Sequence, residues 1–215
     1  MTPRAEPLRV GVLASGRGSN LQALLAATRA PEFPARIVVV LSDRERAAAL
    51  EHASAAGIPG VFVDPKAFGD REAYDVALLA CLAQYRVELV CLAGFMRILG
   101  PAFVRSLRGR LVNVHPSLLP AFPGLHAQRQ ALEHGVKLAG VTVHFVDEGV
   151  DTGPVIAQAS VPVLDDDTEA SLSARILVEE HRLYPDVVRL VAEGRLHLDG
   201  RRVVVRAAAE GEARL

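Results

Sequence analysis

The stretch VNVHPSLLPAFPG, residues 112–124, carries two polar side chains whose types and spacing are suited to catalysis. Asn113 and His115 alternate with valines, and successive side chains of a β-strand point to opposite faces, so both polar groups face one side. Pro116 cannot donate to a sheet hydrogen bond and ends the strand. An amide can stabilise an oxyanion, and an imidazole can transfer a proton near neutral pH. The pair therefore predicts a catalytic strand end, with a hydrogen-bonded buried pair as the alternative.

A later loop, within FVDEGVDTGPVI at residues 145–156, offers carboxylates that could act with this pair. The candidates are Asp147, Glu148 and Asp151, and glycines with a proline shape the turn. The alternative is an acidic loop that is only solvated. No metal site is expected, because the sequence has neither a His-Glu-x-x-His motif nor a zinc-type cysteine pair.

The segment SGRGSN, residues 15–20, follows an apolar run and precedes an amphipathic helix. Glycines allow a sharp turn, and the free N–H groups and partial positive charge of a helix start bind anions. Taken alone, the motif fits a phosphate site and a plain turn capped by Ser19 or Asn20 about equally well. The cluster of hydroxyl and amide donors, which includes Ser15, favours phosphate.

A dinucleotide site is a third interpretation of this loop. The loop is not a Walker A motif, and Leu21 stands where the third glycine of a dinucleotide fingerprint belongs. Asp43, after the next apolar run, imitates a ribose-binding acid, so a nicotinamide-dependent dehydrogenase remains a competitor. That enzyme, or a non-catalytic nucleotide-binding module, would leave Asn113 and His115 without a role.

An α/β fold is expected to position these residues. Short apolar runs alternate with segments of helical period, which predicts a doubly wound, mostly parallel, Rossmann-like sheet with helices on both faces. Ligands of such sheets bind at the carboxyl ends of the strands, where SGRGSN, AGFMRIL and NVHPS fall. We expect strands near residues 8–13, 36–41, 59–63, 87–92, 110–114, 140–146 and 154–162. We expect helices near residues 19–29, 44–57, 70–85, 101–107, 127–134 and 168–192.

No repeat, linker or composition shift marks a domain boundary. We therefore expect a single domain over residues 1–215, with a nucleotide-binding-like half at 8–114, a catalytic half at 115–198 and a frayed tail at 207–215.

Charge and cysteine content exclude several classes of protein. The 24 lysines and arginines balance 25 acidic residues, which argues against nucleic acid as a partner. We expect no signal peptide and no membrane-spanning segment. Cys81 and Cys91 match neither a redox nor a zinc spacing, which indicates two buried thiols in a reducing cytoplasm.

Several motifs together resemble the folate-dependent phosphoribosylglycinamide formyltransferases of purine biosynthesis. They are SGRGSNLQALL, REAYD, LAGFMRIL, NVHPSLLPAFPGLHAQRQAL, GVTVHFVDEGVDTGPVI and a late GRL, and the likeness extends from about residue 8 to about 198. It implies transfer of a formyl group from formyltetrahydrofolate, a co-substrate, to the amine of glycinamide ribonucleotide. It implies no metal, no nucleotide cofactor and no partner beyond these small molecules, and it leaves the oligomeric state open.

The resemblance also implies roles for individual residues. The catalytic residues would be Asn113, which stabilises an oxyanion, His115, which handles protons, and Asp151, which orients the histidine or a proton-carrying water. The phosphate and ribose of the ribonucleotide would meet Gly18, Ser19, Asn20 and Glu180. The folate would meet Arg71, Met96, Arg97, Ile98, Leu99, Asn113, Asp147, Glu148, Gly149, Val150 and Asp151, with the two arginines near its glutamate carboxylates. Without the resemblance, the apolar members of this set would be assigned to the core.

Two related enzymes share the implied triad and remain alternatives. Methionyl-tRNA formyltransferase would carry a further C-terminal RNA-binding domain, and formyltetrahydrofolate deformylase would carry an N-terminal regulatory domain. We expect neither domain, because the first strand begins near Leu8 and the likeness extends to about residue 198 of 215.

Overall fold

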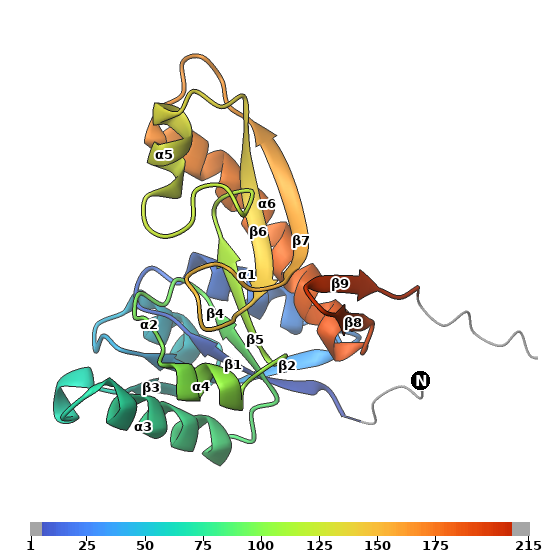
Figure 1. Cartoon of the computed structure of the whole chain (residues 1–215). Coiled ribbons are helices and arrows are strands. Elements are labelled where there is room, and N and C mark those ends of the chain that lie inside the picture. Colours follow the sequence, from blue (N-terminus) through green and yellow to red (C-terminus); the bar gives the residue numbers. More distant parts are fainter. Residues whose placement is uncertain (1–5, 208–215) are drawn as a thin grey trace, which may run out of the picture.

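A seven-stranded sheet in the order β3-β2-β1-β4-β5-β6-β7 forms the centre of the computed structural model, which describes residues 6–207 (Figure 1). Strands β1 to β5 are parallel, and β6 is antiparallel to both of its neighbours. The mostly parallel, doubly wound fold is therefore confirmed. The strands are β1 Leu8–Leu13, β2 Ala35–Ser42, β3 Gly60–Phe62, β4 Leu89–Leu92, β5 Leu111–His115, β6 Leu138–Phe145 and β7 Val155–Pro162.

Helices cover both faces of the sheet. One core layer joins the sheet to α1, α2, α5 and α6, and a second layer on the other face joins it to α3 and α4. The helices are α1 Ser19–Thr28, α2 Ala48–Ala55, α3 Arg71–Gln84, α4 Pro101–Ser106, α5 Ala127–Glu133 and α6 Glu169–Ala192, with a 3₁₀ turn η1 at Pro65–Ala67.

The long helix α6 begins where the sequence predicts and braces the strand that carries Asn113 and His115. Thr168 caps it, accepting from the Ser171 N–H, and the Ser171 side chain reaches back to the Thr168 N–H as in a capping box. The buried Tyr184 hydroxyl lies 3.0 Å from the carbonyl of Leu92 and 3.2 Å from that of Val112. These contacts join α6 to the carboxyl end of β4 and to β5.

The structure contains a hairpin that the sequence analysis missed. Strands β8 Leu196–Asp199 and β9 Arg202–Val205 pair antiparallel as a separate two-stranded sheet. The Asp-Gly dipeptide at the turn, which follows the alternating Leu196 and Leu198, is a signal that could have predicted it. The tail expected at 207–215 lies outside the described residues from 208 onward.

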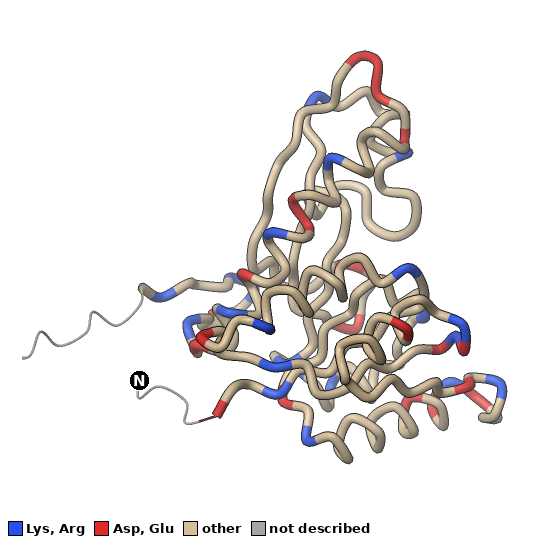
Figure 2. Tube along the Cα trace, turned by 180° about the vertical axis from the view of Figure 1, so that it is seen from behind, with Lys and Arg blue, Asp and Glu red and all other residues tan. Residues whose placement is uncertain are grey.

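Charged residues of both signs are interspersed along the trace (Figure 2). Within residues 6–207, no helix combines the length and apolarity that are needed to cross a membrane.

Candidate active site

The carboxyl end of β5 presents its two polar side chains as the alternation predicts. Val112 and Val114 pack into the core on one face, while Asn113 and His115 lie opposite His144 and Thr142 of β6. His115 is buried and Asn113 is half-buried.

Asp151 reaches this strand end from the loop between β6 and β7. Its Oδ2 lies 3.3 Å from His115 Nδ1 and accepts a 2.8 Å hydrogen bond from the Gly124 N–H. Its Oδ1 lies 3.4 Å from Asn113 Nδ2, a long hydrogen bond. The structure thus brings Asn113, His115 and Asp151 together, although Asp151 is 38 residues from Asn113 along the chain.

Of the three carboxylates that the sequence offered, only Asp151 joins the strand end. Asp147 Oδ1 accepts from the Gly149 N–H and the Thr152 hydroxyl, so its carboxylate shapes the loop itself. Glu148 forms an exposed ion pair with Arg105 of α4.

Asp151 combines an uncommon backbone conformation with a lowered side-chain pKa. Its backbone has φ = 53°, in the left-handed region that non-glycine residues rarely occupy. Burial acts to raise the pKa of Asp151, but hydrogen bonding with His144 and the Gly124 N–H, together with the charge of His115, brings that pKa below its ordinary value. Asp151 is therefore a carboxylate at neutral pH, in a conformation that the surrounding contacts must maintain.

The two ring nitrogens of His115 both face acceptors. Nε2 lies 2.9 Å from the carbonyl oxygen of Phe122, and Nδ1 faces the Asp151 carboxylate. A carbonyl oxygen only accepts, so both contacts are hydrogen bonds when the ring is an imidazolium. The site thus offers an acceptor to each ring nitrogen of His115.

His144 is a member of the cluster that the sequence analysis did not assign. Its ring is 2% exposed, and its Nδ1 lies 2.9 Å from the carbonyl oxygen of Phe145, so Nδ1 carries the hydrogen. Its Nε2 lies 3.2 Å from Asn113 Nδ2 and 3.6 Å from Asp151 Oδ1, so His144 contacts both of these residues. The signal was present: a histidine among valines, directly before the acidic loop, on the strand predicted near 140–146.

The glycine loop lies at the same edge of the sheet. Gly18 has φ = 72°, and a Cβ there would lie 3.0 Å from Ala49 Cα, so this position requires glycine. The start of α1 has no side-chain cap and no acidic residue in its first turn. Its first N–H groups, beginning with Ser19, therefore have no side-chain acceptor from the cap, an arrangement that can bind an anion.

Asn20 pairs with α6 instead of capping α1. Its Nδ2 donates to Glu180 Oε2 at 2.6 Å in a buried contact across 160 residues. Burial raises the pKa of Glu180, against the opposing effects of the Asn20 hydrogen bond and the charge of His115. Asn20 Oδ1 is buried and has no hydrogen-bond partner among the described residues, so an acceptor is left for a ligand donor.

Ser15, grouped by the sequence analysis with the phosphate donors, joins two loops in the structure. Its hydroxyl accepts from the Met96 N–H at 2.8 Å, and its own N–H donates to the Gly94 carbonyl at 3.1 Å. Strands β1 and β4 are neighbours, so the loops that follow them meet as predicted.

The segment after β4 leaves apolar side chains uncovered. Met96 is 60% exposed and Ile98 is 69% exposed, while Leu99 is half-buried against the core. Val150, on the loop that carries Asp151, is also exposed. Uncovered apolar groups on both segments are what a flat aromatic ligand could bury.

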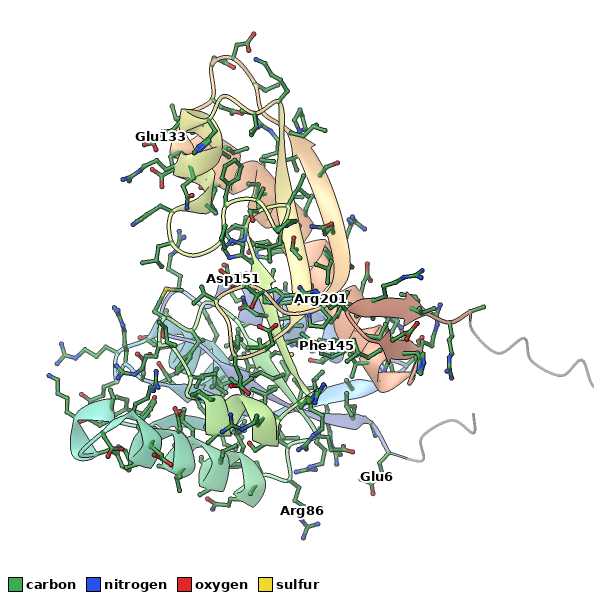
Figure 3. The ribbon with its side chains drawn as sticks, in the orientation of Figure 1. Glu6, Arg86, Glu133, Phe145, Asp151 and Arg201 are labelled. Atoms are coloured by element: carbon green, nitrogen blue, oxygen red, sulfur yellow. The ribbon has the colours of Figure 1, made fainter. Side chains whose placement is uncertain are left out.

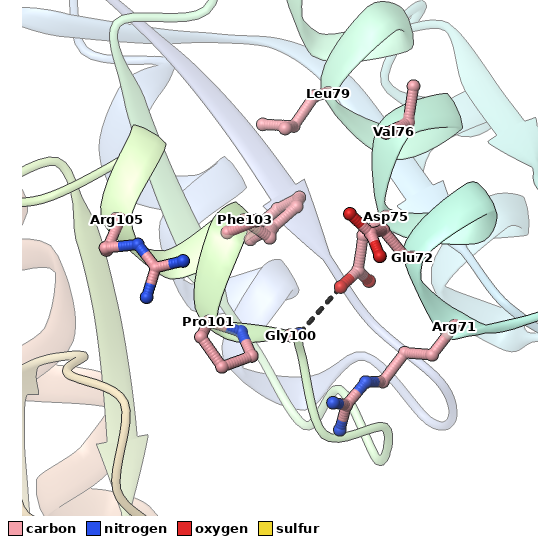
Figure 4. Close-up of a pocket in the computed structure, with 10 residues that line it drawn as sticks. Arg71, Glu72, Asp75, Val76, Leu79, Gly100, Pro101, Phe103 and Arg105 are labelled. Carbon is pink, nitrogen blue, oxygen red and sulfur yellow. Dashed lines mark hydrogen bonds between the residues drawn. The ribbon is translucent and has the colours of Figure 1, made fainter.

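The two arginines expected near a folate tail belong to neighbouring elements. The Arg97 guanidinium lies 5.2 Å from the ring centroid of Tyr74 in α3, and Arg71 is the first residue of α3. Arg71 also lines a cavity of about 230 Å³ between α3 and α4, where Asp75 accepts from the Gly100 N–H (Figure 4). This cavity does not include the cluster of Asn113, His115 and Asp151.

Among the described residues, no group of three or more histidine, cysteine, aspartate or glutamate side chains could hold a metal ion.

Residues 8–188 match the profile of the family described as formyl transferase. The chain belongs to the formyl transferase family. The resemblance inferred from the motifs is therefore confirmed at the level of the family.

Relatives with assigned names agree with this membership. The phosphoribosylglycinamide formyltransferase of Escherichia coli is 45% identical over 212 residues, which cover 95% of this chain and 100% of that protein. The crystal structure of glycinamide ribonucleotide transformylase 1 from Symbiobacterium toebii superposes with a TM-score of 0.93 at 54% identity, over 95% of this chain and 96% of that one. The trifunctional purine biosynthetic protein adenosine-3 of Drosophila melanogaster is 54% identical over 188 residues, which cover 86% of this chain. The chain spans only 14% of the length of that trifunctional relative.

Proposed function

We propose that this protein transfers the formyl group of formyltetrahydrofolate to the amine of glycinamide ribonucleotide, a step of de novo purine biosynthesis. The observation that carries the proposal is the junction of Asn113, His115 and Asp151 at one strand end, flanked by an uncapped helix start and an uncovered apolar segment. The names of the relatives that match nearly their full length support the same reaction.

Each side of the junction suits one substrate. The free N–H groups at Ser19 would bind the phosphate, while Asn20 and Glu180 would bind ribose hydroxyls. The pteridine and benzoyl rings would cover Met96, Ile98 and the loop at residues 147–151.

The chemistry requires one group for negative charge and another for protons. Attack of the substrate amine on the formyl carbon produces a tetrahedral oxyanion, and the folate nitrogen leaves with a proton that the attacking amine gives up. Asn113 would donate to the oxyanion in place of its long contact with Asp151, and a protonated His115 would assist. Asp151 would hold His115 in its cationic form and orient it, or orient a water that carries the proton.

The decisive assay omits each substrate in turn. Purified protein is incubated with glycinamide ribonucleotide and formyltetrahydrofolate, and folate absorbance is followed. Turnover that requires both substrates supports the transferase, whereas turnover without the ribonucleotide indicates a deformylase. Formylation of methionyl-tRNA would instead indicate a methionyl-tRNA formyltransferase.

The proposal extends to the setting of the enzyme. Both cysteines, Cys81 and Cys91, are free thiols, which suits a reducing cytoplasm. Small molecules are the proposed partners, and the reaction needs neither a metal nor a nucleotide cofactor.

Replacing Glu180 by glutamine should weaken ribonucleotide binding. The ribonucleotide KM is expected to rise about tenfold to a hundredfold, since hydrogen bonds to a charged group contribute about 1.5–3 kcal/mol. The folate KM should stay close to wild type. Glu179→Gln, a neighbouring change on the helix surface, is the control, and equal KM changes for both substrates would remove Glu180 from the ribonucleotide site.

The same variant has an expected effect on stability. Because burial raises the pKa of Glu180, the folded protein gains stability as pH falls through that raised pKa, and at neutral pH the charged form opposes folding. Glu180→Gln should therefore keep or raise the melting temperature at neutral pH.

Replacing Arg97 by alanine should raise the folate KM about fivefold, the scale of an exposed ion pair, with kcat nearly unchanged. The reason is that Arg97 would meet the glutamate tail, which binds equally in the ground and transition states. Steady-state kinetics at saturating ribonucleotide measure this, with Arg86→Ala as an exposed control beyond the end of α3. A lower kcat with an unchanged folate KM would show that Arg97 does not bind the glutamate tail.

A further inference from the structure

The loop between β6 and β7 is tightly constrained around Asp151. A Cβ at Gly153 would overlap the carbonyl oxygen of Phe145, and a Cβ at Gly149 would overlap the Thr152 hydroxyl. The Phe145 N–H donates to the Pro154 carbonyl at 2.9 Å, which closes the base of the loop. The left-handed backbone of Asp151 is therefore one part of a close-packed turn.

One contact holds this turn from outside. Arg201 Nη2 donates to the backbone carbonyl of Thr152 at 2.6 Å, directly after Asp151. Figure 3 shows Arg201 between the C-terminal hairpin and the loop that carries Asp151. The Thr152 carbonyl belongs to the peptide between Thr152 and Gly153, so this hydrogen bond fixes the chain one residue beyond Asp151. It thereby limits how far the Asp151 backbone, and with it the direction of the carboxylate, can shift.

The hairpin that supplies Arg201 is itself anchored. Gly200 has φ = 59° and allows the two-residue turn that places Arg201 at the tip. Leu196 and Val203 pack against the main core, and β9 lies against β7. Arg195 Nε donates to the Arg206 carbonyl at 2.8 Å and closes the open end of the hairpin. The tip is therefore a firm support, although it lies beyond the family profile, which ends at residue 188.

We propose that Arg201 is a positioning residue, through which the C-terminal hairpin holds Thr152 and thereby aims the Asp151 carboxylate at His115. The contact geometry stands independently of the reaction, but the catalytic consequence rests on the proposed formyl transfer. The hydrogen bond of Arg201 is to a backbone carbonyl, so its effect is exerted through the backbone of the loop.

The kinetic test compares Arg201→Ala and Arg201→Lys with wild type. One hydrogen bond contributes about 0.5–1.5 kcal/mol. Removing it in Arg201→Ala should therefore lower kcat about twofold to tenfold and leave the ribonucleotide KM unchanged. Lysine can still donate to a carbonyl, so Arg201→Lys should recover most of the rate. The control is Arg202→Ala, an exposed neighbour with no hydrogen bond or ion pair of its side chain within residues 6–207.

A double-mutant cycle asks whether Arg201 acts through Asp151. In an Asp151→Asn background, Arg201→Ala should change kcat by less than about twofold, because coupled residues are not additive. A full loss in that background would overturn the proposal, since Arg201 would then act by another route.

Amide hydrogen exchange supplies a readout that needs no substrate. Exchange of a peptide that covers residues 146–154 should quicken in Arg201→Ala and not in Arg202→Ala, while exchange in α1 stays constant. Faster loop exchange with wild-type kcat would overturn the proposal, as would unchanged exchange. Wild-type protein that does not transfer formyl groups would contradict the proposed reaction. If exchange in the loop is still faster in Arg201→Ala, the structural role of Arg201 is supported independently of that reaction.

Discussion

Replacing Asp151 by asparagine is expected to lower kcat/KM by about a hundredfold to ten-thousandfold, the usual contribution of general acid–base catalysis. The change removes the charge that faces His115 Nδ1 and keeps the size of the side chain. Asparagine also tolerates the left-handed backbone of this position, so the loop should keep its shape. Steady-state kinetics with both substrates measure the effect, and Asp165→Asn, an exposed acid paired with Lys137, is the matched control.

Stability separates a catalytic role of Asp151 from a structural one. Because its pKa is lowered in the fold, the Asp151 carboxylate stabilises the protein at neutral pH, and this stabilisation is lost as pH falls through the folded pKa. Urea unfolding should therefore show a modest loss for Asp151→Asn at neutral pH that shrinks in acid. Near-normal turnover in a correctly folded variant would leave Asp151 as a loop residue only.

Replacing His115 by alanine is expected to lower kcat by about a hundredfold to ten-thousandfold as well. His115 is the group at this strand end whose two nitrogens face both a carboxylate and a carbonyl, an arrangement that suits proton transfer. Added imidazole should restore part of the rate, because a small base can enter the space that the ring leaves.

His197→Ala, an exposed histidine of β8, serves as the control and should behave as wild type, with or without imidazole. Circular dichroism at neutral pH checks that His115→Ala is folded. Wild-type turnover by His115→Ala would contradict the catalytic roles proposed for Asn113, His115 and Asp151.

Local patterns predicted most of the elements of the fold. The helix expected at 168–192 is observed at Glu169–Ala192, because a capping residue and a long amphipathic period are both local signals. The hairpin at 196–205 was missed although its Asp-Gly turn was visible, since two short exposed strands have a weak apolar pattern.

The choice among the acidic residues shows where local patterns end. Asp147, Glu148 and Asp151 lie within five residues and look alike in the sequence. In the fold they have three different partners: their own loop, Arg105 of α4, and the end of β5. Only the resemblance to a family singled out Asp151 beforehand, because backbone direction over a few residues decides which carboxylate turns inward.

By itself, the sequence determined the alternation that turns Asn113 and His115 to one side, the glycine that α1 needs before it begins, and the parallel sheet that brings the loops to one edge. These follow from backbone geometry over two to four residues. Tertiary structure alone decided that Asn20 pairs with Glu180, that His144 contacts Asn113, and that Arg201 contacts the loop of Asp151. The partners in these contacts are 31 to 160 residues apart, and no local propensity specifies a pairing that only the packing of whole elements creates.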